Sequence, residues 1–206
     1  MSNRRREESL QKFNEAASTY DSKSSRWTEQ THPYILAELK LETISAILDI
    51  GCGTGTLLSK VDGDIRKAGL DLSPEMLKKA RDKLGAEVDL RVGDSEKLPW
   101  PKDSFDAVTI NLSFHHYEHP ETVLTEVHRV LKNNGRVIVG DMCPPFPLIR
   151  FVNLLMRFGH GGDIHLYSQM EMRKLLNQTG FQEICWKRTT RSAFIVSARV
   201  TKITAI

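Results

Sequence analysis

Short apolar runs alternate with segments of helical spacing along most of the chain, and this alternation constrains the fold more than any other feature. Each run is five or six residues long and is bounded by turn residues, which is typical of strands buried on both faces of a sheet. The runs are residues 46–50, 68–72, 88–92, 105–110 and 136–140. Repeated strand–helix–strand order predicts an α/β fold, a doubly wound and mostly parallel sheet with helices on both faces.

Capping residues mark where several helices begin. Ser73 followed by Pro74 predicts a helix that runs to about Leu84. The segment Ser168-Gln169-Met170-Glu171 has the spacing of a capping box and predicts a helix that Gly180 closes. No helical pattern separates the last two apolar runs, near 183–187 and 193–200, so we expect an antiparallel hairpin at one edge of the sheet.

Two segments depart from the alternating pattern. Residues 1–45 are polar, and we expect them to form an N-terminal cap of two helices, the second beginning at Pro33, before a main domain at 46–206. Residues 142–167 combine prolines, an apolar stretch at 148–158 and a glycine-rich end. This insert follows a predicted strand, where open α/β sheets bind ligands, so it is expected to act as a lid.

Composition excludes several classes of protein. The chain has 206 residues, the length of one ordinary domain with a small appendage, and a formal charge of +3, too small to predict nucleic-acid binding. No stretch approaches the roughly 20 apolar residues of a membrane span, and no apolar run follows the N-terminal arginines as in a secretory signal. The three cysteines are widely spaced, which disfavours a disulfide framework and favours the cytoplasm.

Three glycines at alternate positions follow the first predicted strand. Gly51, Gly53 and Gly55 allow a tight turn and a close approach of the backbone to a ligand. We expect a helix directly after them, with its first N–H groups facing that ligand. The spacing G-x-G-x-G is one residue shorter than the dinucleotide fingerprint, which disfavours a nicotinamide-dependent oxidoreductase, although that alternative stays open.

An acidic residue follows the next predicted strand at an informative distance. Asp71 lies 20 residues after Gly51. This is the usual spacing for a carboxylate that accepts hydrogen bonds from the hydroxyls of a ribose. The two features together predict a site for a nucleoside-containing cofactor.

Several motifs, taken jointly, resemble those of class I S-adenosylmethionine-dependent methyltransferases, and more narrowly the group of the ubiquinone and menaquinone C-methyltransferases. They are Asp49–Gly55, Asp71, the pair Gly93-Asp94, the run 98–106 and, more weakly, 13–21. The resemblance implies a Rossmann-like sheet of seven strands with one antiparallel strand at its edge. It also implies methyl transfer from S-adenosylmethionine to a small molecule, with S-adenosylhomocysteine as the product.

The same resemblance implies a set of cofactor-binding residues. They are Tyr20, Asp49, Gly51, Cys52, Gly53, Gly55, Asp71, Leu72, Asp94, Ser95 and Asn111. Asp71 is expected to hold the ribose hydroxyls, and Asp94 the amino group of adenine. Asp49 and the backbone of Asn111 are expected near the amino group of the methionine portion, and Tyr20 would close over the cofactor.

The loop after the fourth predicted strand holds the candidate catalytic residues. His115 or His116 is a candidate general base near neutral pH, and His160 and His165 of the insert are candidates to face the acceptor. No histidines have metal-ligand spacing on a helix, so no metal site is expected.

Nucleobase-methylating motifs are absent from the loop, which favours a small organic acceptor. A non-catalytic cofactor-binding partner subunit or sensor remains an alternative. The acceptor and the oligomeric state stay open.

Overall fold

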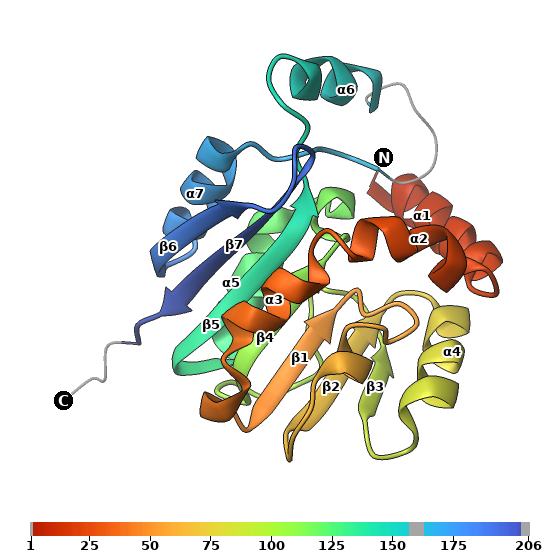
Figure 1. The fold of residues 1–206 in the computed structure, drawn as a ribbon, viewed down its shortest axis with the longest axis vertical. Helices are drawn as coiled ribbons and strands as arrows, with labels where there is room; N and C mark the ends of the chain where they lie inside the picture. Colours follow the sequence, from red (N-terminus) through yellow and green to blue (C-terminus); the bar gives the residue numbers. More distant parts are fainter. Residues whose placement is uncertain (1, 157–162, 203–206) are drawn as a thin grey trace.

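The computed structural model describes residues 2–156 and 163–202, which form seven strands in a single sheet (Figure 1). The order across the sheet is β3-β2-β1-β4-β5-β7-β6, and β1 to β5 pair in parallel. The strands are β1 Ala46–Ile50, β2 Arg66–Asp71, β3 Asp89–Val92, β4 Phe105–Asn111, β5 Leu131–Met142, β6 Phe181–Arg188 and β7 Ala193–Val200. The predicted α/β class and the mostly parallel sheet are confirmed.

The last two strands form the predicted hairpin at the edge of the sheet. β7 is antiparallel to both of its neighbours, β5 and β6, and β6 is the outermost strand. Trp186 of β6 stacks on Phe194 of β7 with ring centroids 3.9 Å apart. This aromatic pair helps fix the register of the hairpin.

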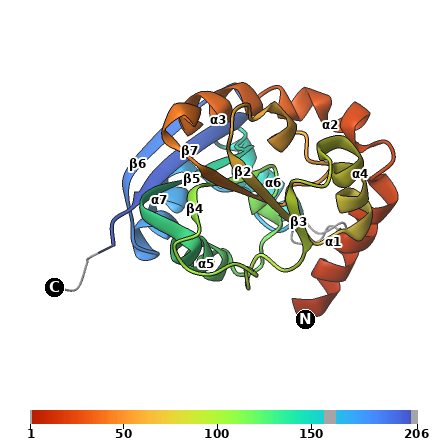
Figure 2. The same cartoon turned by 90° about the horizontal axis from the view of Figure 1, so that it is seen from below.

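Helices cover both faces of the sheet (Figure 2). The helices are α1 Ser2–Ala16, α2 Tyr20–Thr28, α3 His32–Leu39, α4 Pro74–Leu84, α5 Pro120–Val130, α6 Leu148–Met156 and α7 Gln169–Gln178. One core packs beneath α3 and α4 and contains Ile47, whereas the other packs beneath α5 and α7 and contains Leu48. Adjacent residues of β1 enter different cores because successive side chains of a strand point to opposite faces.

The helix expected after the glycines is absent, and that prediction was wrong. Residues 51–57 form turns, and only a single 3-10 turn, Leu58–Lys60, precedes β2. The connection between β1 and β2 has 15 residues, and the three glycines all have positive φ. After the glycines, few residues remain before the chain must return to the sheet. A helix that short would form too few hydrogen bonds to offset the cost of its nucleation. The connection between β3 and β4 also lacks a helix.

The N-terminal segment forms three α-helices, where the sequence predicted two. α1 and α2 lie over the carboxyl ends of β1 to β3 (Figure 1). α3 instead packs on the sheet itself, where Ile35 and Leu39 are fully buried. The predicted cap at 1–45 is therefore built from α1 and α2, while α3 belongs to the layer that covers β4, β5 and β7.

The insert after β5 contains α6, which stands apart from the sheet (Figure 1). Asn153 of α6 exchanges two side-chain hydrogen bonds with the backbone of Leu166, at 2.8 and 2.9 Å. Residues 157–162, and with them His160, lie outside the described residues. Within the part of the chain that the structure describes, no helix combines the length and apolar character needed to cross a membrane.

Candidate cofactor and acceptor site

A cavity of about 150 Å³ lies where α1 and α2 cover the carboxyl ends of the parallel strands. Its walls come from these two helices, the glycine turn, the residues that follow β2 and β3, and the loop after β4. Open parallel sheets bind ligands at this edge because the strands end there and their loops diverge. The position of the cavity is thus set by the topology.

Most of the predicted cofactor residues lie in this cavity or beside it. The main cavity is lined by Tyr20, Gly51, Gly53, Asp71, Leu72, Asp94 and Ser95. A smaller cavity of about 40 Å³ is lined by Asp49, Cys52 and Asn111, and it shares Tyr20, Gly51 and Gly53 with the first. Gly55 lines neither cavity and instead packs against α4, where an added Cβ would lie 2.6 Å from Leu84.

The glycine turn brings the backbone to the cavity wall. Gly51 has a φ of 69°, and a Cβ there would lie 2.6 Å from the Oγ of Ser113, in the loop after β4. Gly53 has a φ of 53°, and an added Cβ there would make only an ordinary contact with the ring of Tyr20 at 3.9 Å. Both positions therefore disfavour side chains on conformational grounds, and Gly51 also lacks the space for one.

Replacing Gly51 with Ala is expected to destabilise the protein by roughly 2 kcal/mol or more, because a left-handed conformation alone costs an L-residue about 1–2 kcal/mol. Gly63→Ala is the matched control, since Gly63 has a φ of 99° and its added Cβ would make only ordinary contacts at 3.8 Å. Urea unfolding should show that the free energy of unfolding falls more in Gly51→Ala than in Gly63→Ala. Equal losses in the two variants would contradict the steric argument.

Asp71, at the end of β2, connects the glycine turn to α4. Its Oδ2 accepts the N–H of Gly53 at 2.7 Å, and its Oδ1 accepts the N–H of Ser73 at 2.8 Å. Burial raises the pKa of Asp71, although these two backbone hydrogen bonds oppose the shift. A carboxylate has about four lone-pair sites, so both oxygens can still accept a hydrogen bond from a ligand.

Asp49 is a buried carboxyl within β1. Burial raises its pKa to about 7, against the hydrogen bond that Thr109 donates at 2.7 Å. The nearby Asn111 has a buried side-chain oxygen without a hydrogen-bond partner among the described residues. A buried carboxyl and an unsatisfied amide oxygen at one small cavity suit a ligand that carries an ammonium group.

Asp94 follows β3 and is held by α1, which the sequence did not predict. Its Oδ2 pairs with Arg6 of α1 at 2.6 Å, and its Oδ1 accepts the N–H of Glu96 at 3.0 Å. Arg6, Ser9 and Phe13 of α1 all line the main cavity. The ion pair therefore links α1 to this end of the cavity.

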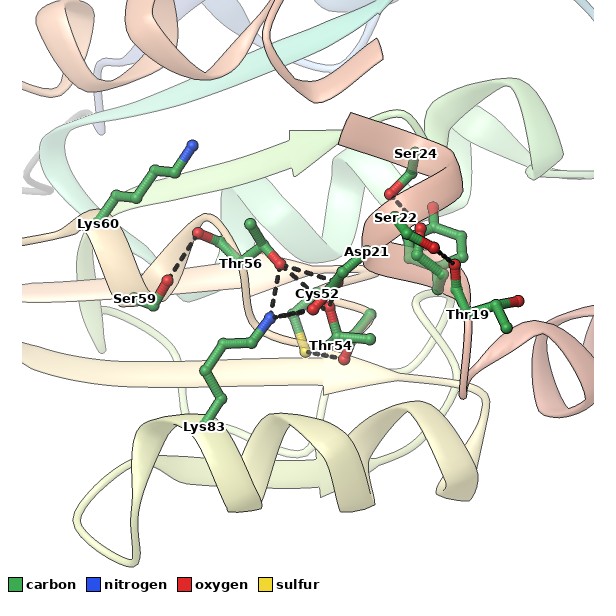
Figure 3. Close-up of polar contacts among 12 residues, drawn as sticks. Thr19, Asp21, Ser22, Ser24, Cys52, Thr54, Thr56, Ser59, Lys60 and Lys83 are labelled. Atoms are coloured by element: carbon green, nitrogen blue, oxygen red, sulfur yellow. Dashed lines mark hydrogen bonds and ion pairs between the residues drawn. The ribbon is translucent and has the colours of Figure 1, made fainter. Parts of the chain in front are cut away.

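A second polar cluster fastens α2 to the glycine turn (Figure 3). Lys83 of α4 donates to Asp21 at 2.7 Å and to Thr56 at 2.8 Å. Thr54 of the turn also donates to Asp21, which is adjacent to the cavity-lining Tyr20. These contacts join α2, α4 and the turn, and they hold Tyr20 over the cavity.

The two candidate catalytic histidines occupy a 3-10 turn, Phe114–His116, after β4. His116 lines the main cavity, whereas His115 is 5% exposed and lies behind it. Burial lowers the pKa of His115, but the charge of Asp141 and a 2.7 Å hydrogen bond to it raise the pKa above its usual value. His165 of the insert lines neither cavity: its backbone N–H donates to the carbonyl of His115 at 3.2 Å, and its ring bonds to Glu171 at 3.0 Å.

Sequence reasoning missed several residues of the main cavity. They are Arg6, Ser9, Phe13, Ile50, Leu70, Met76, Gly93, Glu96, Leu112, Ser113, Tyr117, Glu118 and Ile164. Ile50 and Gly93 lie within recognised motifs, and Leu70 lies beside Asp71, so proximity to a motif was an available signal. Phe13 lies in the recognised segment 13–21, whereas Arg6, Ser9 and Ile164 reach the cavity only through long-range packing.

Comparisons with known proteins show the class to which a chain with this fold belongs. The sequence model of a family described as "Methyltransferase domain" matches residues 48–139. A demethylmenaquinone methyltransferase from Symbiobacterium thermophilum is 32% identical over 154 residues, which are 68% of this chain and 61% of that protein. A ubiquinone/menaquinone biosynthesis C-methyltransferase from Desulfotalea psychrophila is 30% identical, over 69% of this chain and 68% of that protein. The chain belongs to the class I S-adenosylmethionine-dependent methyltransferases, in the group of the ubiquinone and menaquinone C-methyltransferases.

Solved structures share the fold at lower sequence identity. One is the complex between the Haloferax volcanii Trm112 methyltransferase activator and a methyltransferase. The match has a TM-score of 0.79 at 21% identity, and it covers 92% of this chain and 98% of that chain. The expected seven-stranded methyltransferase architecture is thereby confirmed.

Proposed function

We propose that this protein transfers a methyl group from S-adenosylmethionine to a small organic acceptor. The observation that carries the proposal is that Asp71, the glycine turn and the buried Asp49 line two neighbouring cavities at the ends of β1 and β2, which share Gly51 and Gly53. Asp71 as a carboxylate that binds hydroxyls and Asp49 as a carboxyl that binds an ammonium group match the two ends of the donor. Family membership supports the same chemistry.

Six of the predicted residues have a proposed role in holding the donor. Asp71 accepts hydrogen bonds from the ribose hydroxyls, and Leu72 packs against the adenine. Asp94 and Ser95 contact the edge of the adenine, with Arg6 beside them. Asp49 and the side-chain oxygen of Asn111 accept from the amino group, and the latter role differs from the backbone contact that the sequence predicted.

The donor supplies the electrophilic methyl carbon, and the protein chiefly aligns the acceptor with it. The acceptor's electron pair forms the new bond, while the pair of the broken carbon–sulfur bond stays on sulfur. Such positioning can supply about 7–11 kcal/mol of the barrier. His116, Tyr117 and Ile164 are proposed to contact the acceptor, because they line the main cavity beyond the glycine turn. His115 is proposed to position His116 from behind.

A small acceptor and a cytoplasmic location are part of the proposal. The relatives named as ubiquinone/menaquinone biosynthesis C-methyltransferases support a small acceptor. All three cysteines are free, and Cys185 is exposed, as expected for a reducing compartment.

Isothermal titration calorimetry with S-adenosylhomocysteine tests the first half of the proposal. We expect one binding event per chain, with no comparable heat from NAD. Incubation with S-adenosylmethionine and a panel of phenols, quinols, thiols and amines tests the second half through release of S-adenosylhomocysteine. Binding without turnover of any acceptor would favour a sensor or partner subunit. Binding of NAD that is tighter than binding of S-adenosylhomocysteine would contradict both the methyltransferase and the sensor.

A further inference from the structure

Three potential metal ligands meet at one edge of the main cavity. His115 and His116 come from the turn after β4, and Asp163 comes from the insert that follows α6. The Oδ1 of Asp163 is 3.2 Å from the Nδ1 of His116 and 3.9 Å from the Nε2 of His115. One ligand atom from each residue fits within 4.8 Å of the others.

A carboxylate behind His115 orients its ring. Asp141, buried at the end of β5, accepts the N–H of His115 through Oδ2 at 3.0 Å and bonds to Nδ1 of its ring at 2.7 Å. This bond places the Nδ1 proton toward Asp141 and leaves the Nε2 lone pair facing Asp163. Histidines that bind metals commonly have such a carboxylate partner on the other ring nitrogen.

We propose that His115, His116 and Asp163 bind a transition-metal ion of the Zn²⁺ type. Two imidazole nitrogens and one carboxylate oxygen suit Zn²⁺, whereas Mg²⁺ and Ca²⁺ prefer oxygen ligands alone. Ligand atoms around a tetrahedral Zn²⁺ lie about 3.3 Å apart, since each is about 2.0–2.1 Å from the ion. The observed 3.2 and 3.9 Å separations are close to that value, so small side-chain rotations complete the site.

The ammonium of Lys12 competes with the ion for the same oxygen. Its Nζ lies 3.2 Å from the Oδ1 of Asp163, in a pair whose side chains are 45% and 40% exposed. An ion pair this exposed contributes little, and the lysine can swing into solvent when a divalent ion binds. Removing the charge of Lys12 should therefore leave metal binding intact or tighten it.

Three protein ligands leave a fourth position open, and His116 and Ile164 place that position at the cavity. An acceptor thiol or phenol that binds there would lose its proton to water, because a bound Zn²⁺ strongly favours the ionised form. This role for the metal rests on the proposed methyl transfer. The metal site itself does not.

The test titrates Zn²⁺ alone, in competition with a chromogenic chelator, into the full chain without any cofactor. All proteins carry Cys185→Ser, because an exposed free thiol can itself bind Zn²⁺. We expect one tightly bound equivalent. His116→Ala and Asp163→Asn should each weaken binding by at least about 100-fold, since loss of the outer partner in Asp141→Asn alone should weaken it by about 10–100-fold.

His119→Ala and Lys12→Gln are the matched controls. His119 is an exposed histidine of the same loop, so its loss should change Zn²⁺ affinity by less than about threefold, within the scatter expected of a surface substitution. Equal Zn²⁺ affinity in the starting protein and in Asp163→Asn would overturn the site. Thermal unfolding without metal checks that each variant folds, and His116 and Asp163 lie on different elements, so one misfolded variant leaves the other as the test. Binding of S-adenosylhomocysteine is measured separately, so failure of the metal site and failure of the methyltransferase proposal are distinguishable.

Discussion

Asp71→Asn is expected to weaken the binding of S-adenosylhomocysteine by about 100-fold or more, while the protein stays folded. A hydrogen bond to a charged group contributes about 1.5–3 kcal/mol, and the proposed role gives Asp71 two hydroxyl partners. Together they amount to about 3–6 kcal/mol, which corresponds to a factor of roughly 10² to 10⁴ in affinity. Isothermal titration calorimetry measures this directly.

Asp82→Asn is the control for this experiment. Asp82 lies on the exposed surface of α4, the helix that begins just after Asp71, and it is not among the residues that line either cavity. The control removes the same charge from the same region and should leave affinity within about threefold, as expected for an exposed substitution. If Asp71→Asn also bound within about threefold of the natural protein, Asp71 would not hold the ribose.

Asp49→Asn is expected to stabilise the protein at alkaline pH and to weaken cofactor binding at the same time. Burial raises the pKa of Asp49 to about 7, so the folded protein retains a proton that the unfolded chain releases near pH 4. The folded state therefore binds more protons between these values, and Asp49 makes unfolding easier as pH rises from about 4 to about 7. Above about pH 7 this decrease in the free energy of unfolding is complete.

The size of the effect follows from the same shift. About 1.5 pH units of this window lie between pH 5.5 and pH 7, and each unit is worth about 1.4 kcal/mol. Urea unfolding at pH 5.5 and pH 8 should therefore show that the Asp49→Asn variant gains about 2 kcal/mol relative to the natural protein across this interval. Calorimetry at pH 8 should show weaker binding of S-adenosylhomocysteine, because the ammonium has lost its carboxylate.

Asp106→Asn provides a control of opposite sign. Asp106 is partly buried, which raises its pKa, but hydrogen bonds from Lys132 and Ser45 outweigh burial and lower the pKa below its usual value. The ionised Asp106 stabilises the folded state at pH values above the unfolded pKa, and this stabilisation is lost only in acid. Asp106→Asn should therefore be less stable than the natural protein at pH 8. A stability change in Asp49→Asn that does not vary with pH would contradict the raised pKa of Asp49.

Much of the fold could be predicted because it depends on local patterns. Apolar runs marked all the strands of the sheet, and Ser73 caps α4 by accepting the N–H of Met76, as its sequence position predicted. The capping box at Ser168 and Glu171 begins α7 in the same way. These features involve residues a few positions apart, so the sequence contains all the information they need.

The glycine turn shows where local patterns were insufficient. Alternate glycines correctly predicted a tight turn after β1, but a helix after them does not form. The chain there is fixed by distant partners, since Gly53 donates to Asp71, and Thr54 donates to Asp21 of α2. Hydrogen bonds to residues 18 and 33 positions away replace the local bonds of a helix.

The strands, the class of fold and the residues that mark a donor site could be predicted, because period, spacing and glycine content act over short stretches of chain. What closes that site depends on contacts between distant segments. Arg6 reaches Asp94, Lys83 reaches Asp21, and Asp163 reaches His116, each across more than 45 positions. Such pairs form because packing brings their elements together, and a charge in a sequence does not specify which opposite charge the fold will place beside it.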